Sequence, residues 1–403
     1  MSVTEARPEA ESPADVATRR DRPWRRAFGL AASVWGGATI GYFLINGMVW
    51  MMLRQTGPPL DKALDAWDQW DTGHYIKIAL YGYKGVVAET PAFFPLYPML
   101  VRYLEPVLPG GALSAGLIIS HAACLGALTV LFRLVEDLFD VALARRTVLF
   151  LMAYPFAFFL VTAYNEGVFL FFSVAAFYCM RRGNWWAAGA LGALASATRQ
   201  AGVLLVVGFA IEYLRQRGWR LNRVRADALA ILVVPLGMAS YAVWCWLAFG
   251  DPLYFVTVQS MWGREPTLPW VGSVRAIEQI AVAINENGSI FQPIVVFNVI
   301  DLLAVVATGT LLVLSVVGPW RLGRESAFLV ATAIVGFIVI VISPITRNVP
   351  LHGVPRYVLE MLPAFIVMAR IGAKPHLERL YLMPALLIQG VILLAFYFDY
   401  FVA

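Results

Sequence analysis

The sequence predicts an all-α protein that crosses a membrane about eleven times, within an expected range of nine to thirteen. The chain of 403 residues is 60% hydrophobic and only 14% charged, which is more apolar surface than a soluble core of this size buries. Its apolar residues also come in runs near the about 17–25 residues that cross a bilayer. Finally, most Lys and Arg residues gather in alternate loops between these runs, as they do in multi-pass membrane proteins.

The predicted spans follow one another from the first apolar run to the C-terminus. They are 27–53, 112–134, 147–163, 167–180, 185–197, 201–214, 228–249, 293–317, 327–343, 357–369 and 381–398. Several spans between residues 147 and 214 are too short to cross straight, and we expect them to form two tight hairpins packed inside protein. Residues 1–26 are polar and are predicted to be a disordered tail, so residues 27–403 are predicted to form a single transmembrane domain.

The loop charges predict the orientation. Arginines crowd the N-terminal tail and alternate short loops, which places the tail in the cytoplasm of a cell whose plasma membrane holds the protein. The first outer loop, about 54–111, is then extracytoplasmic and is expected to be helical. A second outer loop covers about 250–292. The net charge of +5 follows this topological pattern and does not indicate a nucleic-acid partner.

Polar groups that are hard to explain as solvated surface all fall on the predicted outer side. Ionisable groups at membrane depth are costly, so they are functional candidates by default. The segment 347–356 contributes further polar residues to the same side. We therefore expect one polar cavity that opens outward. Its candidate residues are Asp68, Asp71, Tyr164, Glu166 and Arg199.

The first outer loop contains the sequence WDQWDTGHY, residues 67–75. Taken as a helical turn, it places Trp67, Trp70, Asp71 and His74 on one face, because positions three and four apart are neighbours. A carboxylate against an aromatic wall can act as a general base. Asp68 and Asp71 can instead hold a divalent cation through oxygen ligands. A third interpretation is an interfacial aromatic belt with solvated acids.

Further candidates also have two interpretations each. The segment PAFFPLYPML, residues 91–100, either lines a groove for a lipid chain or anchors the loop by packing. Glu166 and Arg199 either pair with each other or with backbone carbonyls, or Arg199 binds an anion such as phosphate, a role for which Arg347 and Arg356 are also candidates. His352 either hydrogen-bonds a sugar or phosphate or is structural. The stretch GALGALASA predicts close helix packing, and the three cysteines have no metal-ligand spacing.

The combined blocks WDTGHYIKIALYGY and AFFPLYP resemble the PIG-V family of mannosyltransferases. The later stretches AYNEGVFLFFS, ATRQAGVLL and PRYVLEMLPAF are similar to later segments of that family. The resemblance extends from about residue 61 to residue 363.

The resemblance implies a glycosyltransferase of the GT-C class, which takes mannose from a polyprenyl-phosphate carrier and inverts the anomeric centre. A lipid or glycan would be the acceptor, on the outer face. Asp71 matches the family's expected base, whereas Asp68 matches no aspartate of the motif. Arg199 or Arg356 would stabilise the leaving phosphate. The remaining substrate-binding candidates are Asp68, His74, Tyr75, Tyr164, Glu166 and His352.

The alternative to an enzyme is a transporter or flippase of lipid-linked sugars. Such a protein would place polar groups near the middle of the membrane and would show two related halves. Here the polar groups lie at one face, and no internal repeat is evident.

Overall fold

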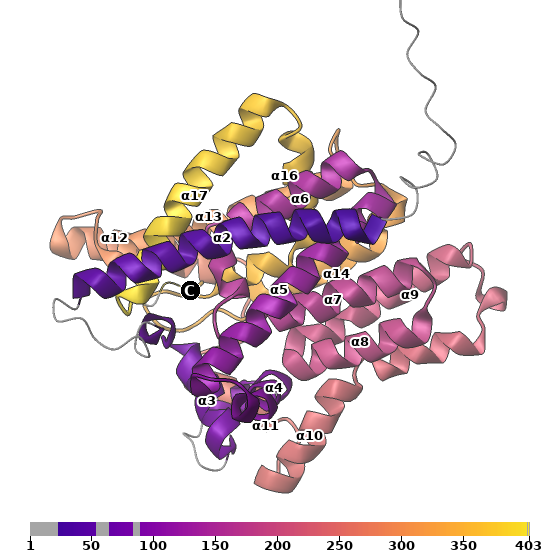
Figure 1. Ribbon diagram of the computed structural model, residues 1–403, viewed down its shortest axis with the longest axis horizontal. Coiled ribbons are helices and arrows are strands. Elements are labelled where there is room, and N and C mark those ends of the chain that lie inside the picture. The colour runs from indigo at the N-terminus through magenta and orange to yellow at the C-terminus, as the bar shows by residue number, and fades with distance from the viewer. Residues whose placement is uncertain (1–22, 54–63, 84–88, 401, 403) are drawn as a thin grey trace, which may run out of the picture.

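The computed structural model describes residues 23–53, 64–83, 89–400 and 402. In these ranges the regular elements are helices, apart from one isolated antiparallel bridge between Arg264 and Ile345. This confirms the all-α prediction (Figure 1). The predicted disordered tail lies almost entirely outside the described residues, as do residues 54–63 and 84–88 of the first outer loop.

Every predicted span has a helical counterpart. These are α2 (Pro23–Leu53), α5 (Gly111–Leu138), α6 (Val141–Ala153) with η6 (Ala157–Leu160), α7 (Glu166–Arg181), α8 (Trp185–Thr198), η7 (Gln200–Leu204) with α9 (Leu205–Gln216), η9 (Ala226–Val233) with α10 (Leu236–Phe249), α13 (Pro293–Val316), α14 (Ala327–Val341), η12 (Val358–Glu360) with α16 (Leu362–Ile371), and α17 (Pro375–Tyr397). Within the described ranges, five helices are long and apolar enough to cross a membrane, or six if the bent η9–α10 pair is one span. The count of eleven crossings therefore stays a prediction.

Helix α5 forms the centre of the bundle (Figure 1) and packs against α2, α6 and α7. The predicted hairpins are partly wrong, because α6 packs mainly against α5 and α16, whereas α7 packs against α8. Both α6 and α7 therefore pack against α5. Since α2 contacts α17, helices from both ends of the chain share one core.

Small residues let α8 approach the bent η9–α10 pair. A Cβ on Gly189 would collide with the carbonyl oxygen of Ala230, and one on Gly237 would collide with the carbonyl oxygen of Ala193. This confirms that the GALGALASA stretch serves close helix packing.

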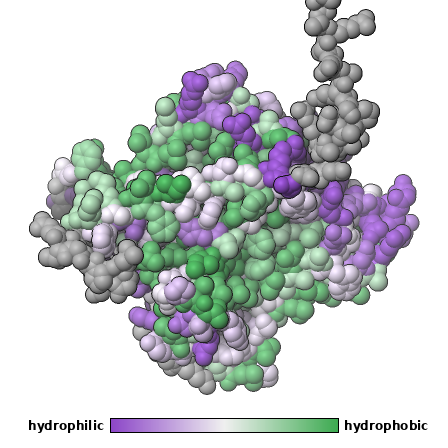
Figure 2. Space-filling model, in the orientation of Figure 1, coloured by the Kyte–Doolittle hydropathy of each residue, from purple (hydrophilic) through white to green (hydrophobic). Residues whose placement is uncertain are grey.

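The two predicted outer loops are largely helical and supply short elements around the bundle. The first contains η2 (Asp65–Trp67), α3 (Asp71–Tyr81), η4 (Thr90–Ala92), α4 (Leu96–Leu104) and η5 (Glu105–Val107). The second contains α11 (Tyr254–Thr257), η10 (Val258–Trp262) and α12 (Val271–Asn287), and α15 (Val354–Tyr357) precedes η12. Elements α3, α4 and α11 gather at the lower end of the molecule in Figure 1. Figure 2 shows hydrophobic side chains over the middle of this face and hydrophilic ones at its margins, the pattern that a membrane belt requires.

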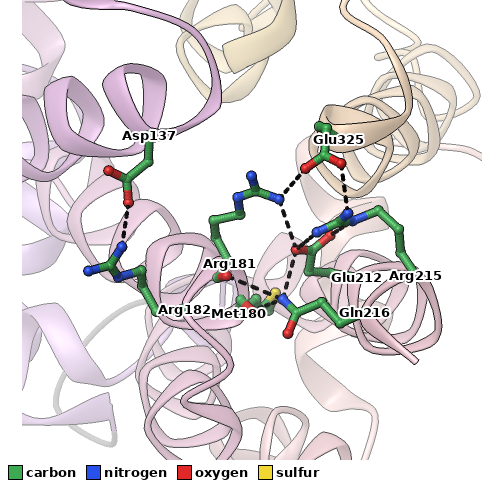
Figure 3. Close-up of polar contacts among 8 residues, drawn as sticks. All are labelled: Asp137, Met180, Arg181, Arg182, Glu212, Arg215, Gln216 and Glu325. Atoms are coloured by element: carbon green, nitrogen blue, oxygen red, sulfur yellow. Dashed lines mark hydrogen bonds and ion pairs between the residues drawn. The ribbon is translucent and has the colours of Figure 1, made fainter. Parts of the chain in front are cut away.

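A charged network ties together the ends of α7 and α9 and the short η11 (Arg324–Ser326), as Figure 3 shows. Arg215 donates two hydrogen bonds, of 2.6 and 2.8 Å, to the fully buried Glu212 and one of 3.0 Å to Glu325. Arg181 reaches the same two acids. This network lies at the last turn of α7, on the side that the loop charges predict to be cytoplasmic.

Candidate active site

A buried cluster of five charged side chains lies at the opposite end of α7. The 16 residues of α7 rise about 24 Å, so the cluster and the network of Figure 3 are separated by most of a bilayer core. The five side chains are at most 16% exposed. They are Asp71 at the start of α3, Glu166 at the start of α7, Arg199 after α8, Arg356 in α15 and Glu360 in η12.

The two guanidinium groups of the cluster each bridge two carboxylates. Arg356 contacts Asp71 at 2.7 Å and Glu166 at 3.2 Å. Arg199 contacts Glu166 at 3.0 Å and Glu360 at 3.1 Å. Four of these five residues were predicted as candidates, and the structure brings them together across as many as 285 positions of the chain.

The backbone at Trp70 determines where Asp71 lies. Trp70 adopts φ +52°, a conformation rare for residues other than glycine, and α3 begins at the next residue. The Tyr164 hydroxyl holds this break, because it accepts a hydrogen bond from the Asp71 N–H and donates one to the Gln69 carbonyl, both 3.1 Å. Backbone strain of this kind costs about 1–3 kcal/mol and is typical of functional sites.

The prediction of one continuous helical turn through WDQWDTGHY is therefore wrong. Trp67 belongs to the separate η2 and is fully buried against Phe43 and Tyr397, whereas Trp70 is 39% exposed. Asp71 and His74 do share α3, as predicted.

Tertiary hydrogen bonds place the other members of the cluster. The side chain of Asn165 donates to the Thr198 carbonyl at 2.9 Å, which brings the residue after α8 next to the start of α7. As first residues of helices, Asp71 and Glu166 also lie at the positive end of the helix dipole, which favours carboxylates.

Aromatic rings surround the guanidinium groups. Arg356 lies over the rings of Phe159, Tyr164 and Tyr357, at 5.4–5.6 Å from their centres. Arg199 lies 4.8 Å from the centre of the Tyr357 ring. Cation–π contacts of this kind stabilise cations that are removed from water.

The cluster has one carboxylate more than it has guanidinium groups. Glu166 Oε2 is buried and has no hydrogen-bond partner within the described part of the chain. A buried acceptor without a donor is costly, so a hydroxyl-bearing ligand would supply what this oxygen lacks.

His74 and Tyr75 form an aromatic wall beside the cluster. The His74 ring stacks on Phe93 at 4.8 Å and meets the edge of Trp262 from the second outer loop at 5.5 Å. Burial lowers the pKa of His74. Tyr75 is buried against Phe93 and Tyr97, so the PAFFPLYPML segment serves as a packing element here.

Asp68 does not join the cluster. Its side chain is exposed, and its pKa is raised by partial burial and by the charge of Asp65. In the ranges that the structure describes, no group of three or more His, Cys, Asp or Glu side chains is arranged to hold a metal ion. The divalent cation considered for Asp68 and Asp71 therefore lacks a third side-chain ligand of these types among the described residues.

His352 is buried at 7% exposure beside the cluster. Burial lowers its pKa to about 3, with contributions from the nearby charges of Arg356 and Arg264. The imidazole is therefore neutral at physiological pH and can hydrogen-bond without adding charge.

The low pKa of His352 makes stability depend on pH. Between about pH 6.5 and 3 the unfolded chain binds a proton at this residue and the folded chain does not, so acid favours unfolding. On lowering the pH from 7 to 5, we expect this residue to cost about 2 kcal/mol, which His352→Gln should avoid. Thermal unfolding of both proteins at the two pH values measures this difference, and equal pH dependence would contradict it.

Three residues of the site were not predicted: Tyr357, Glu360 and Arg264. Glu360 is a lone acid at the start of an apolar run, the same signal that identified Glu166. Tyr357 and Arg264 have no such signal, because a tyrosine and a loop arginine are ordinary at a membrane boundary. The competing candidate Arg347 is exposed on the loop before α15.

The charged groups converge as predicted, but they pack against one another, and the cavity beside them is apolar. This cavity of about 80 Å³ lies between α7, α9, α14 and α16. Glu360 forms part of its wall, and the rest includes Phe169, Phe177, Leu205 and Leu329.

A helical bundle with an apolar belt and a buried charged site at one end defines a multi-pass membrane protein. The family model described as Mannosyltransferase (PIG-V) matches residues 58–270, just over half of the chain, so the chain belongs to this family.

The chain is similar to GPI alpha-1,6-mannosyltransferase 2 of Rattus norvegicus, with 30% identity over 188 residues, which are 43% of this chain and 37% of that protein. Its likeness to the Mus musculus protein of the same name is 27% over 236 residues, or 52% of this chain and 44% of that protein. The matched part thus covers less than half the length of these relatives.

Among solved structures, the chain is similar to ArnT from Cupriavidus metallidurans bound to undecaprenyl phosphate. The TM-score is 0.51 with 16% identity, over 84% of this chain and 61% of that chain. At this identity the likeness shows only that the two chains share a fold.

Proposed function

We propose that the protein is a membrane mannosyltransferase that takes mannose from a polyprenyl-phosphate donor. The acceptor is a hydroxyl of a lipid-linked molecule or glycan on the extracytoplasmic face of the plasma membrane. The observation that carries the proposal is the cluster itself: in a chain of the PIG-V family, the aspartate that matches the family's base is fixed by Arg356 at the start of a helix.

Asp71 is the general base in this mechanism. Arg356 holds Asp71 Oδ2, and the side chain is 16% exposed, so the second carboxylate oxygen is left for a substrate hydroxyl. That oxygen takes the proton of the acceptor hydroxyl while the hydroxyl oxygen attacks the anomeric carbon. The bond from the anomeric carbon to the phosphate oxygen breaks, the configuration inverts, and the polyprenyl phosphate leaves with the electron pair.

The other residues of the cluster hold and orient the substrates. Glu166 Oε2 accepts a hydrogen bond from a sugar hydroxyl, and Arg199 and Arg356 fix the carboxylates and supply a positive field for the leaving phosphate. Tyr164 keeps the Trp70 break in place, and the His74 ring, which stacks on Phe93, packs against the sugar with the buried Tyr75 behind this wall.

A lipid-linked donor is supported by the surroundings of the cluster. The apolar cavity adjoins Glu360, so apolar lining and charged groups meet at this end of the bundle, as a ligand with a lipid tail and a charged head requires. ArnT, which shares the fold, was solved with undecaprenyl phosphate. A flippase instead needs its charged groups near the middle of the spans, whereas these five lie at the ends of helices or in short segments between them.

The test is a transfer assay with the purified full chain in detergent. We expect label to pass from polyprenyl-phosphate [14C]mannose, and not from GDP-mannose, to a lipid-linked or glycan acceptor. Movement of intact lipid-linked mannose across a vesicle membrane without any new glycosidic product would identify a flippase and overturn the proposal.

A further inference from the structure

We propose that Arg264, on the second outer loop, binds the phosphate group of the donor, a role that the sequence suggested for Arg199 or Arg356. The inference rests on the proposed function, because it assumes a phosphate-linked donor. It assigns to this loop a part in donor recognition that neither the sequence nor the family match indicated.

Backbone hydrogen bonds hold the loop around Arg264 against the segment 342–346. Arg264 pairs with Ile345 as an antiparallel bridge. The N–H of Thr346 donates to the Gly263 carbonyl at 2.7 Å, and the N–H of Thr267 donates to the Ile342 carbonyl at 2.8 Å. These backbone bonds hold Arg264 at a defined position although it lies on a loop.

Three guanidinium groups converge on the ring of Tyr357. Their central carbons lie 4.8 Å (Arg199), 5.5 Å (Arg356) and 5.8 Å (Arg264) from its centre. Arg264 also donates to the Tyr357 hydroxyl at 3.2 Å and to the Ser343 carbonyl at 3.1 Å. Tyr357 therefore connects the second outer loop to the charged cluster.

The partners of the three arginines differ. Arg199 and Arg356 each contact two carboxylates, so their charges are already compensated. In the described ranges Arg264 forms no ion pair, and its hydrogen bonds go to neutral oxygens. A guanidinium has five N–H donors in a planar fork that suits phosphate oxygens. An incoming phosphate thus gains most from Arg264, since binding there breaks no existing ion pair.

The neighbourhood of Arg264 favours an anion. The pKa of His352 is lowered in part by Arg264 as well as by Arg356, so the charges of both arginines act on the same neutral imidazole. A phosphate beside this imidazole would be attracted by the uncompensated charge of Arg264. The charged cluster of three carboxylates and two guanidinium groups has an excess of negative charge. This excess disfavours a phosphate inside the cluster and leaves that region for the sugar.

The experiment compares two ligands that differ only in the phosphate. Purified full-length protein is titrated with undecaprenyl phosphate and with undecaprenol. We expect the wild type to bind the phosphate more tightly, and Arg264→Gln to weaken phosphate binding about 10- to 100-fold while leaving undecaprenol binding unchanged, as loss of a charge-assisted hydrogen bond predicts. Arg264→Lys should keep part of the preference. Arg347→Gln, an exposed arginine on the neighbouring loop, is the matched control and should bind as the wild type does.

Each outcome decides the inference. If Arg264→Gln keeps the full preference for undecaprenyl phosphate, Arg264 is not the phosphate ligand, and mannose transfer by the wild type still upholds the proposed function. If the wild type itself shows no preference, both the inference and the phosphate-linked donor fail. Should Arg264→Gln not elute as a single folded species, Tyr357→Phe tests the same point: it keeps the charge, removes its hydrogen-bonding partner, and should weaken phosphate binding several-fold.

Discussion

Asp71→Asn should lower the turnover of mannose transfer by about 10²- to 10⁴-fold, the range over which a general base accelerates a reaction. An asparagine has nearly the same shape but no basic oxygen to take the proton of the acceptor hydroxyl. It also removes the charge that Arg356 contacts at 2.7 Å. The measurement is the rate of glycosidic product formation per molecule of folded protein, at saturating donor and acceptor.

The control for this prediction is Asp68→Asn, in the same loop. Asp68 is exposed and does not belong to the charged cluster, so its variant should transfer mannose within about threefold of the wild type. Transfer by Asp71→Asn at the rate of Asp68→Asn would remove Asp71 from the role of base. Loss of activity in Asp68→Asn alone would reverse the assignment of the two aspartates.

The candidate residues were predictable because an ionisable residue within a membrane protein's apolar stretches is costly and therefore indicates a functional site. Glu166 and Arg199 interrupt apolar stretches, where an ionisable group is retained only for a reason. Their mutual pairing was one of the two interpretations that the sequence allowed, and the 3.0 Å contact supports it. Glu360, the second carboxylate that Arg199 contacts, interrupts an apolar stretch in the same way but was not predicted.

Other features depend on tertiary structure and leave no local trace. The backbone break at Trp70 occurs at a residue that is neither glycine nor proline, so the sequence does not predict it. It depends on the Tyr164 hydroxyl, 94 positions further along the chain, which hydrogen-bonds to the backbone on both sides of Trp70. Arg264 is one of several loop arginines until the backbone pairing with Ile345 brings it to Tyr357. The partner of α6 was mispredicted for a related reason, since chain order does not determine which helices are neighbours in a bundle.

Arg356→Lys should reduce mannose transfer by about 100-fold or more, although the positive charge is kept. The two carboxylates that Arg356 contacts come from different helices and meet different nitrogens, Nη1 for Asp71 and Nε for Glu166. A lysine ammonium is a compact point charge and cannot reproduce this planar fork. Arg356→Gln should also destabilise the fold by about 3–5 kcal/mol, because Asp71, Glu166 and Glu360 would then face Arg199 as the only arginine left in the cluster.

The network of Figure 3 provides a matched control for this substitution. Arg215 likewise bridges two carboxylates, Glu212 and Glu325, but at the far end of α7. We therefore expect Arg215→Lys and Arg356→Lys to lower the midpoint of thermal unfolding by similar amounts. Arg215→Lys should leave mannose transfer per folded molecule unchanged. Thermal unfolding and transfer rates of the two lysine variants separate the effects. If both variants transfer mannose equally well, the fork of Arg356 contributes only to stability, and the positioning of Asp71 must come from the Trp70 break alone.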